Sequence, residues 1–239
     1  MKLDILIFAV HPDDAELGCS GTILKHKAAS KKVGVIDLTR GELGSRGSAE
    51  IRDEEAKAAA EILGLDVREN LAMRDGFFQN DEAHILQVIR KIRQYQPEIV
   101  IGNAFTDRHP DHGRASKLIN DAVFLSGLVK IQTEMNGLPQ AQWRPGLLLH
   151  FIQDTYIKPD ILIDVTPFWE TKMESVRAYK TQFYSPDYDE ENQTYISNPE
   201  FIKAVEARAR DYGKSIGVTF AEGFTSSKLL GVDSLFNLI

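Results

Sequence analysis

The chain has 239 residues, 43% of them hydrophobic and 26% charged, with a formal net charge of -7 at pH 7. This composition is typical of a water-soluble globular protein long enough for one large α/β domain, and it argues against a nucleic-acid binder, since Lys and Arg form no cluster. The one cysteine, Cys19, excludes an intrachain disulfide and a Cys-rich zinc site, which fits a reducing compartment such as the cytoplasm.

Short apolar runs alternate along the chain with segments of helical periodicity. The first run, residues 3–10 (LDILIFAV), is too short to cross a membrane and predicts a buried strand. Further strands are predicted at residues 33–38, 98–102, 147–152 and 161–165. Residues 48–63 are rich in Ala and Glu and predict a helix. In a second predicted helix, apolar residues recur at helical spacing from Ile85 until Pro97 ends it.

Strands that alternate with helices imply right-handed crossovers. The sequence therefore predicts an α/β fold: a Rossmann-like, mostly parallel sheet with helices on both faces, in a single domain over residues 1–239. The turn after the first strand lacks the GxGxxG spacing of a dinucleotide site and offers only Gly18 and Gly21. The polar stretch 185–198 predicts a long exposed loop or lid.

Two similar stretches each follow a predicted strand and precede a predicted helix. HPDD occupies residues 11–14, and HPDH occupies residues 109–112. Because the carboxyl ends of parallel strands meet at one edge of a sheet, where open α/β folds bind ligands, we expect both stretches on one rim. A spacing of three residues across a turn lets two side chains converge on one point, and proline at the second position fixes the turn.

The histidine and carboxylate side chains of these stretches suit a hydrolytic zinc site. Two histidines and one carboxylate leave a coordination position open, whereas a structural zinc would take four protein ligands. The remaining groups supply a carboxylate to accept a proton from the attacking water and an imidazole to stabilise charge on the substrate. The residues alone predict metal-assisted hydrolysis of an amide, without telling whether Asp13 or Asp14 is the ligand.

A simpler interpretation exists for one copy of the motif. A lone His-Pro-Asp is commonly a helix start, in which the aspartate caps free backbone N–H groups. Two copies after two strands, which together hold three of the six histidines, favour a site over coincidence. His26 and His84, inside and at the start of predicted helices, are interpreted as ordinary surface residues.

Four stretches resemble a known family: HPDD at 11–14, TRGELGSRGSAEIRDEE at 39–55, MRDG at 73–76 and HPDH at 109–112. They are similar to the LmbE-like family of zinc-dependent N-acetylglucosamine de-N-acetylases. Residues 194–224 (TYISNPEFIKAVEARARDYGKSIGVTFAEGF) resemble the C-terminal part of the bacillithiol biosynthesis deacetylases within that family.

The resemblance implies roles for the residues of both stretches. One Zn2+ per chain, replaceable by other divalent metals, would be bound by His11, Asp14 and His112. Asp13 would be the general base that later protonates the leaving amine. His109 would polarise the acetyl carbonyl and stabilise the oxyanion, and Asp111 would orient His109.

The same resemblance implies residues that surround the substrate. Arg52 and Asp75 would hold sugar hydroxyls, although a helix salt bridge and a plain turn are the respective alternatives. Tyr195 would lie near the oxyanion, or would only cover an edge of the core. Arg108 would meet an acidic aglycone, or would pair with Asp107.

The resulting hypothesis is a zinc-dependent hydrolase that removes acetate from a small-molecule N-acetylglucosaminide, with N-acetylglucosaminyl-malate of bacillithiol biosynthesis as the expected substrate. The two malate carboxylates would need compensation from Arg108, Arg52 and Arg46. One alternative is a deacetylase of another N-acetylglucosamine compound, such as a chitooligosaccharide. Another is a non-catalytic, metal-dependent sugar-binding protein, against which the intact Asp13 argues. The resemblance also implies a homo-oligomer, a trimer or a hexamer, and no nucleic-acid or membrane partner is expected.

Overall fold

The computed structural model describes residues 1–186, 188 and 192–238. The strands of its main sheet are β1 (Ile5–Ala9), β2 (Val33–Thr39), β3 (Val67–Met73), β4 (Ile99–Gly102), β7 (Leu147–Phe151), β8 (Ile161–Asp164) and β9 (Ala221–Thr225). The helices are α1 (Asp14–Ala28), α2 (Ala49–Leu63), α3 (Glu82–Tyr95), α4 (Pro110–Ser126), α5 (Trp169–Arg177) and α6 (Pro199–Ile216). A small hairpin pairs β5 (Glu134–Met135) with β6 (Leu138–Pro139), and 3-10 turns span Thr166–Phe168 and Leu235–Asn237.

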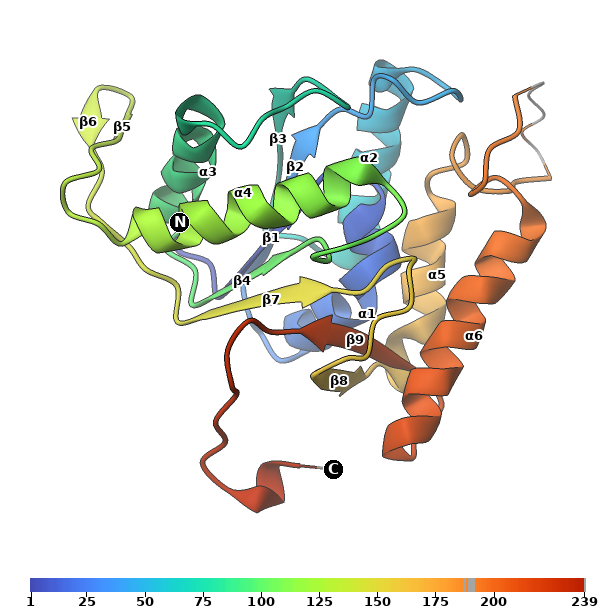
Figure 1. The fold of residues 1–239 in the computed structure, drawn as a ribbon. Coiled ribbons are helices and arrows are strands. Elements are labelled where there is room, and N and C mark those ends of the chain that lie inside the picture. Colours follow the sequence, from blue (N-terminus) through green and yellow to red (C-terminus); the bar gives the residue numbers. More distant parts are fainter. Residues whose placement is uncertain (187, 189–191, 239) are drawn as a thin grey trace.

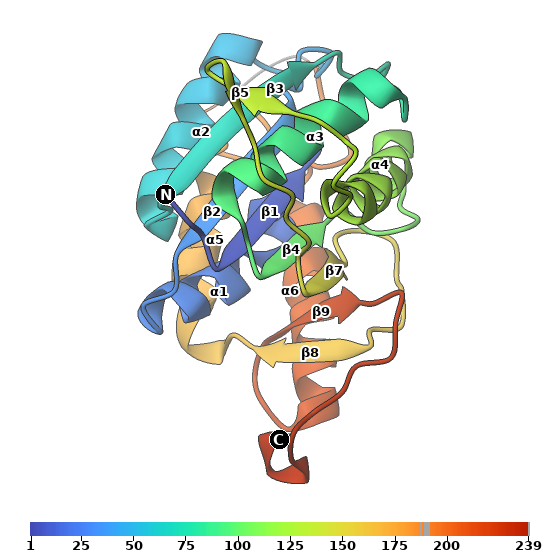
Figure 2. The ribbon, with the colours of Figure 1, turned by 90° about the vertical axis from the view of Figure 1, so that its left-hand side faces the viewer.

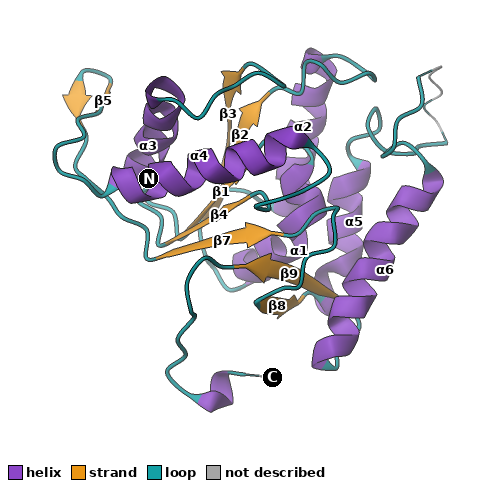
Figure 3. Ribbon diagram, in the orientation of Figure 1, coloured by secondary structure: helices purple, strands orange, loops and turns teal. Residues whose placement is uncertain are grey.

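Within the described residues, seven strands form one sheet in the order β3-β2-β1-β4-β7-β9-β8 (Figure 1). The first five strands of that order are parallel, while β9 runs antiparallel to both β7 and β8. Figure 3 shows the strands between two sets of helices. The prediction of a Rossmann-like, mostly parallel α/β domain is therefore confirmed.

Alternation along β1 explains why its sequence is apolar throughout. Leu6 and Phe8 pack into a cluster with residues of α3 and α4, whereas Ile5 and Ile7 pack on the other face with residues of α1. Because helices cover both faces of this parallel strand, apolar residues are favoured at every position of β1, whichever face the side chain points to. The turned view in Figure 2 shows α3 and α4 on one side of the central strands, with α2 and α5 on the other.

The predicted elements exist, with ends displaced by one to a few residues. All five predicted strands are present, and the two predicted helices are α2 and α3. Two strands of the main sheet were missed. β3 (VRENLAM) is an edge strand and carries charged residues, and β9 (AEGFT) contains a buried glutamate, so neither shows an apolar run. Among the described residues, no helix combines the length and apolarity that a membrane crossing needs.

Residues outside the sheet also bear on the sequence predictions. Cys19 is buried inside α1, as expected. His26 and His84 are half-buried. His26 bonds the Thr22 carbonyl within α1, and His84 bonds Asp81, the N-cap residue of α3. The described part of the predicted loop 185–198 forms neither helix nor strand before residue 199, whereas Asp187 and residues 189–191 lie outside the described residues.

Helix α1 begins at the first histidine stretch, and its packing fixes that stretch against the sheet. Gly18 lies so close to Phe151 of β7 that a Cβ on Gly18 would be 2.2 Å from the Phe151 ring. The helical geometry breaks at Cys19, and the Glu222 carboxylate of β9 accepts the freed N–H groups of Gly21 and Thr22 at 2.9 and 2.7 Å. The start of α1 is thereby attached to two strands distant in sequence.

Replacing Gly18 by Ala is expected to destabilise the protein by about 1–3 kcal/mol, because the added methyl group overpacks against Phe151. Urea denaturation followed by circular dichroism measures this change. Gly231→Ala is the matched control, since nothing lies within 4 Å of its Cβ position. Equal unfolding free energies for the two variants would contradict the packing described for α1.

Candidate active site

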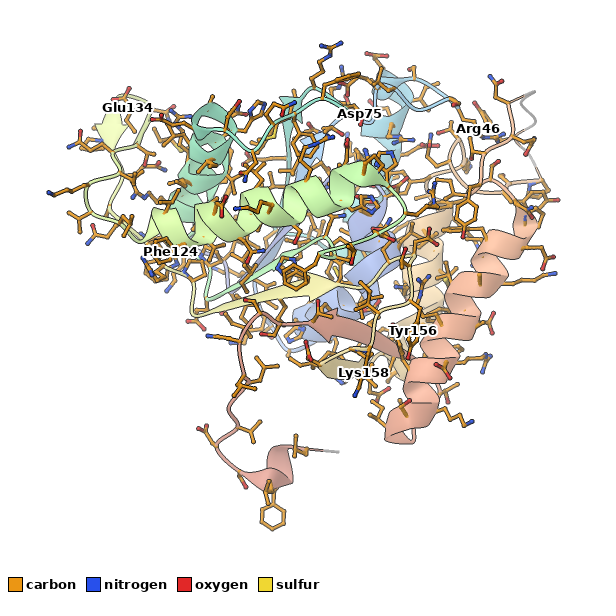
Figure 4. The ribbon with its side chains drawn as sticks, viewed as in Figure 1. Arg46, Asp75, Phe124, Glu134, Tyr156 and Lys158 are labelled. Carbon is orange, nitrogen blue, oxygen red and sulfur yellow. The ribbon has the colours of Figure 1, made fainter. Side chains whose placement is uncertain are left out.

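The two histidine stretches lie together at the carboxyl edge of the sheet, as predicted. HPDD follows β1 and runs into α1, and HPDH follows the loop after β4 and opens α4. A cavity of about 360 Å³ lies between them, lined by every residue of the predicted set except Asp111 and Arg46. Figure 4 marks Asp75 close to the N-terminal end of α4 at this edge. A second cavity of about 360 Å³ lies beside α2 and β3, but no histidine lines it.

The aspartates of the first stretch do not cap α1. Asp13 occupies the N-cap position with φ 132° and no side-chain capping bond. Asp14 instead turns back and accepts the N–H of His11 at 3.0 Å. Such a positive φ is strained for a residue with a Cβ, and strained residues concentrate at functional sites. The interpretation of this stretch as a plain helix start is therefore wrong.

The Asp14 carboxylate lies between two histidine rings. Its Oδ1 is 3.3 Å from Nε2 of His112, and its Oδ2 is 3.6 Å from Nδ1 of His11. Two amide side chains hold the carboxylate in place: Asn103 donates to Oδ2 at 3.0 Å, and Gln153 donates to Oδ1 at 2.6 Å. The carboxylate thus presents one oxygen to each ring.

A further carboxylate orients each of these rings. Nε2 of His11 bonds Asp75 at 3.1 Å, and Nδ1 of His112 bonds Asp107 at 2.8 Å. Metal-binding histidines commonly use their second nitrogen in this way. Burial disfavours the charged form of both rings, but the neighbouring carboxylates outweigh this effect. Asp14 and Asp75 raise the pKa of His11 to about 10, and Asp14 and Asp107 raise the pKa of His112 to about 9. The local field therefore favours a positive charge at this point.

The histidines form one cluster able to hold a metal ion. Donor atoms of His11, His109 and His112 lie within 4.8 Å of one another, as do those of His11, Asp75 and Asp111. Imidazole nitrogen and carboxylate oxygen are donors that suit zinc and other divalent metals. The donor set, together with its carboxylate supports, fits such an ion.

Asp13 and Arg52 are buried on one wall of the cavity. Burial raises the pKa of Asp13 to about 7; the charge of Arg52 lowers it in part, while Asp14 raises it further. Arg52 donates to the side-chain oxygen of Gln182, and a Cβ on Gly41 would lie 2.1 Å from Arg52 Nη1. The alternative of a solvated helix salt bridge for Arg52 is therefore wrong.

His109 is held by a backbone group and not by the carboxylate that the sequence suggested. Its Nδ1 accepts the N–H of Asp111 at 3.3 Å, so the proton of the neutral ring resides on Nε2. Burial and the charges of His11 and His112 lower the pKa of His109, which favours that neutral form. The Asp111 carboxylate binds the Gly76 N–H at 2.8 Å and Arg114 at 2.5 Å. The prediction that this carboxylate orients His109 is corrected, because it turns toward the loop after β3.

Asp75 is a support of the histidine cluster and more than a turn residue. Its Oδ1 bonds His11, and its Oδ2 accepts the N–H of Leu43 at 3.1 Å. Both oxygens therefore already have protein partners. The expected contact of Asp75 with a sugar hydroxyl stays a prediction.

Arg108 and Tyr195 lie at the mouth of the cavity. Arg108 pairs with Asp154 at 2.9 Å, while only its backbone N–H bonds Asp107, so the predicted alternative of an Arg108–Asp107 side-chain pair is wrong. The Tyr195 hydroxyl donates to Asp154 at 3.1 Å, and the Arg108 guanidinium lies 4.4 Å from the centre of the Tyr195 ring. Tyr195 is 55% exposed, yet its ring lies 5.4 Å from that of the buried core residue Phe201, so it also covers an edge of the core, as the alternative predicted.

Sequence reasoning missed Asn103, Gln153 and Asp154 at this site, and it named Asp107 only as an alternative partner of Arg108. Asn103 and Asp107 follow β4, and Gln153 and Asp154 follow β7. The signal was present, because polar residues directly after a buried strand lie on the ligand-binding edge. They were overlooked since they lie outside the histidine motifs.

The comparisons with known proteins agree with this geometry. Residues 6–123, about half of the chain, match the family described as PIG-L, GlcNAc-PI de-N-acetylase. The crystal structure of a conserved protein from Thermus thermophilus shares the fold, with a TM-score of 0.84, 36% identity, and coverage of 97% of this chain and 98% of that one. The chain belongs to the PIG-L, or LmbE-like, family.

Three further relatives of this chain have names that describe different enzymes. Diacetylchitobiose deacetylase of Thermococcus kodakarensis is 28% identical over 92% of this chain and 81% of that protein. Probable N-acetyl-alpha-D-glucosaminyl L-malate deacetylase 2 of Bacillus anthracis is 30% identical, over 50% of this chain and 58% of that protein. 4-Oxalmesaconate hydratase of Pseudomonas putida is 24% identical over 97% of this chain and 88% of that protein. Two of these three relatives are named deacetylases, and one is named a hydratase.

The Asp107–His112 pair yields a prediction that is independent of any substrate. Asp107→Asn is expected to weaken binding of a divalent metal by about 10–100-fold, because His112 loses the carboxylate that orients its ring. Competition with a chromogenic chelator measures the dissociation constant. Asp121→Asn, at an aspartate of α4 that pairs with Lys117, is the control. An unchanged dissociation constant for Asp107→Asn would remove Asp107 from the metal centre.

Proposed function

We propose that the protein is a zinc-dependent N-deacetylase that hydrolyses the acetamide of an N-acetylglucosaminide to acetate and a free amine. The observation that carries this proposal is the convergence of two histidines on Asp14, next to the buried Asp13, in a cavity of a PIG-L family chain. The proposed zinc ligands are His11, Asp14 and His112. Asp14 is preferred to His109 as the third ligand because its two oxygens face the nitrogens of the other two residues.

The remaining side chains suit the chemistry of amide hydrolysis. Zinc, when bound, acts as a Lewis acid and lowers the pKa of a water molecule toward about 7. Asp13 makes no capping bond, so its carboxylate is available to accept the proton of the attacking water and return it to the amide nitrogen. Water oxygen then bonds the acetyl carbon, the carbon–nitrogen bond breaks, and Nε2–H of His109 donates to the carbonyl oxygen.

The charges around the cavity bear on the aglycone. The three arginines that malate would need already have protein partners. Arg46 donates to the carbonyls of Thr181 and Asn192, Arg52 to Gln182, and Arg108 to Asp154. We therefore favour a neutral saccharide aglycone, as in a chitooligosaccharide, which also agrees with the similarity to diacetylchitobiose deacetylase over most of the chain. N-acetylglucosaminyl-malate stays the second candidate, supported by the resemblance of residues 194–224 to bacillithiol deacetylases.

A substrate panel tests this order of preference. The zinc-loaded protein is expected to release acetate from N,N′-diacetylchitobiose with a higher kcat/KM than from N-acetylglucosaminyl-malate. Arg108 is already paired with Asp154, and Arg46 and Arg52 already donate hydrogen bonds to protein oxygens. A chelator should abolish the release, and added zinc should restore it. A higher kcat/KM for the malate conjugate would reverse the order. Metal binding without turnover of any N-acetyl sugar would instead favour the non-catalytic sugar-binding alternative.

Substitution of each of the two adjacent aspartates tests which one is the base and which one is the metal ligand. Asp13→Asn should retain zinc while kcat falls by about 10²–10⁴, the usual effect of losing a general base. Asp14→Asn should weaken zinc binding first, because an amide oxygen is a poorer ligand than a carboxylate. Metal analysis and steady-state kinetics on the two nearly isosteric variants measure both effects. If Asp13→Asn contained no zinc while Asp14→Asn stayed fully metallated, Asp13 would be the ligand and Asp14 the base.

A further inference from the structure

Three loops meet at one carboxylate at the mouth of the cavity. Arg108 comes from the loop after β4, Asp154 from the loop after β7, and Tyr195 from the segment before α6. Oδ2 of Asp154 accepts from Arg108 Nε at 2.9 Å, and Oδ1 accepts from the Tyr195 hydroxyl at 3.1 Å. The Asp154 side chain is 16% exposed and that of Arg108 is 49% exposed. Arg108 and Tyr195 line the cavity, so the Asp154 carboxylate acts on the cavity through these two side chains.

The backbone on either side of Asp154 is itself attached to the site. The Asp154 carbonyl accepts from Nη1 of Arg208 on α6 at 2.8 Å. The N–H of the next residue, Thr155, bonds Oδ1 of Asp107 at 2.8 Å, and the other oxygen of Asp107 holds His112. Asp154 is therefore fixed relative to the histidine cluster.

We infer that Asp154 is a positioning residue that sets the charge preference of the cavity for the aglycone. This inference rests on the proposed deacetylation of an N-acetylglucosaminide. Asp154 cancels the charge of Arg108 and holds Tyr195 beside it, so the mouth offers hydrogen-bonding and stacking groups while its arginine stays paired. A sugar ring suits such a surface, because its hydroxyls need donors and acceptors and its C–H face packs on an aromatic ring.

Charge balance makes the preference specific to Asp154. The carboxylates that line the cavity, Asp13, Asp14 and Asp75, lie at the inner end beside the histidines. Without Asp154, the guanidinium of Arg108 would face the mouth uncompensated. A planar guanidinium binds carboxylates with two parallel hydrogen bonds, so an acidic aglycone would then gain a partner.

The test compares a neutral and an acidic substrate in a double-mutant cycle. N,N′-diacetylchitobiose and N-acetylglucosaminyl-malate are assayed with zinc-loaded wild type, Asp154→Asn, Arg108→Gln and the double variant. Asp154→Asn should raise the acidic-to-neutral ratio of kcat/KM about fivefold, the upper range for an exposed ion pair. Arg108→Gln alone should change the ratio less than about twofold, whereas in the Asp154→Asn background it should remove the gain. The ratio cancels any common loss of kcat from a less ordered Tyr195.

Two further measurements keep the inference separate from the proposed function. Asp233→Asn, at an exposed aspartate of the C-terminal segment, removes the same charge and should leave the ratio unchanged. Calorimetry on the same variants in an Asp13→Asn background gives the two dissociation constants without turnover. An unchanged ratio in both kcat/KM and affinity, or a gain that persists after Arg108→Gln, would overturn the role of Asp154. Failure of wild type to hydrolyse either compound would refute the deacetylase proposal, while the affinity ratio still decides the role of Asp154.

Discussion

The Asp14 carboxylate joins the carboxyl ends of three neighbouring parallel strands. It accepts hydrogen bonds from the His11 backbone after β1, from Asn103 after β4, and from Gln153 after β7. A buried carboxylate is stable only when its lone pairs have partners, so these bonds both satisfy Asp14 and fix the strand ends around it. The positions of the His11 and His112 rings, and therefore of any metal between them, depend on this arrangement.

The charge of Asp14 is balanced differently from that of other buried carboxylates. Glu16 and Asp37 pair with Arg68, and Glu222 pairs with Lys172, each within 2.8 Å. Among the ion pairs of the described residues, Asp14 has no Lys or Arg partner, and only His11 and His112 face it. A permanent cation would compete with a metal ion, whereas a histidine can release its proton and coordinate the metal instead. The distribution of cations thus keeps the histidine cluster open to a metal while the rest of the buried charge is neutralised.

Local chain geometry made a large part of the fold and the central site predictable. A buried strand is visible as an apolar run, and the two histidine stretches lie within four residues of a helix start. The cluster of His11, Asp14, His109 and His112 could therefore be placed on one rim from the sequence. The proposed assignment of Asp13 as base and Asp14 as ligand came from the family resemblance, because spacing does not reveal which of two adjacent carboxylates faces inward. The edge strand β3 and the short strand β9 were not predicted, since neither has the apolar pattern of a fully covered strand.

The sequence by itself determined which chemical groups reach the edge of the sheet, because a strand, a turn and a helix start place them there through bonds along a few residues. Only the tertiary structure decided their partners. Asp111 turns to Arg114 and leaves His109 to a backbone amide, while Asp154 reaches Arg108 across 46 positions of the chain. Those pairings depend on the strand order and on the paths of the loops, which arise from packing between distant segments and leave no periodic or spaced pattern in the sequence.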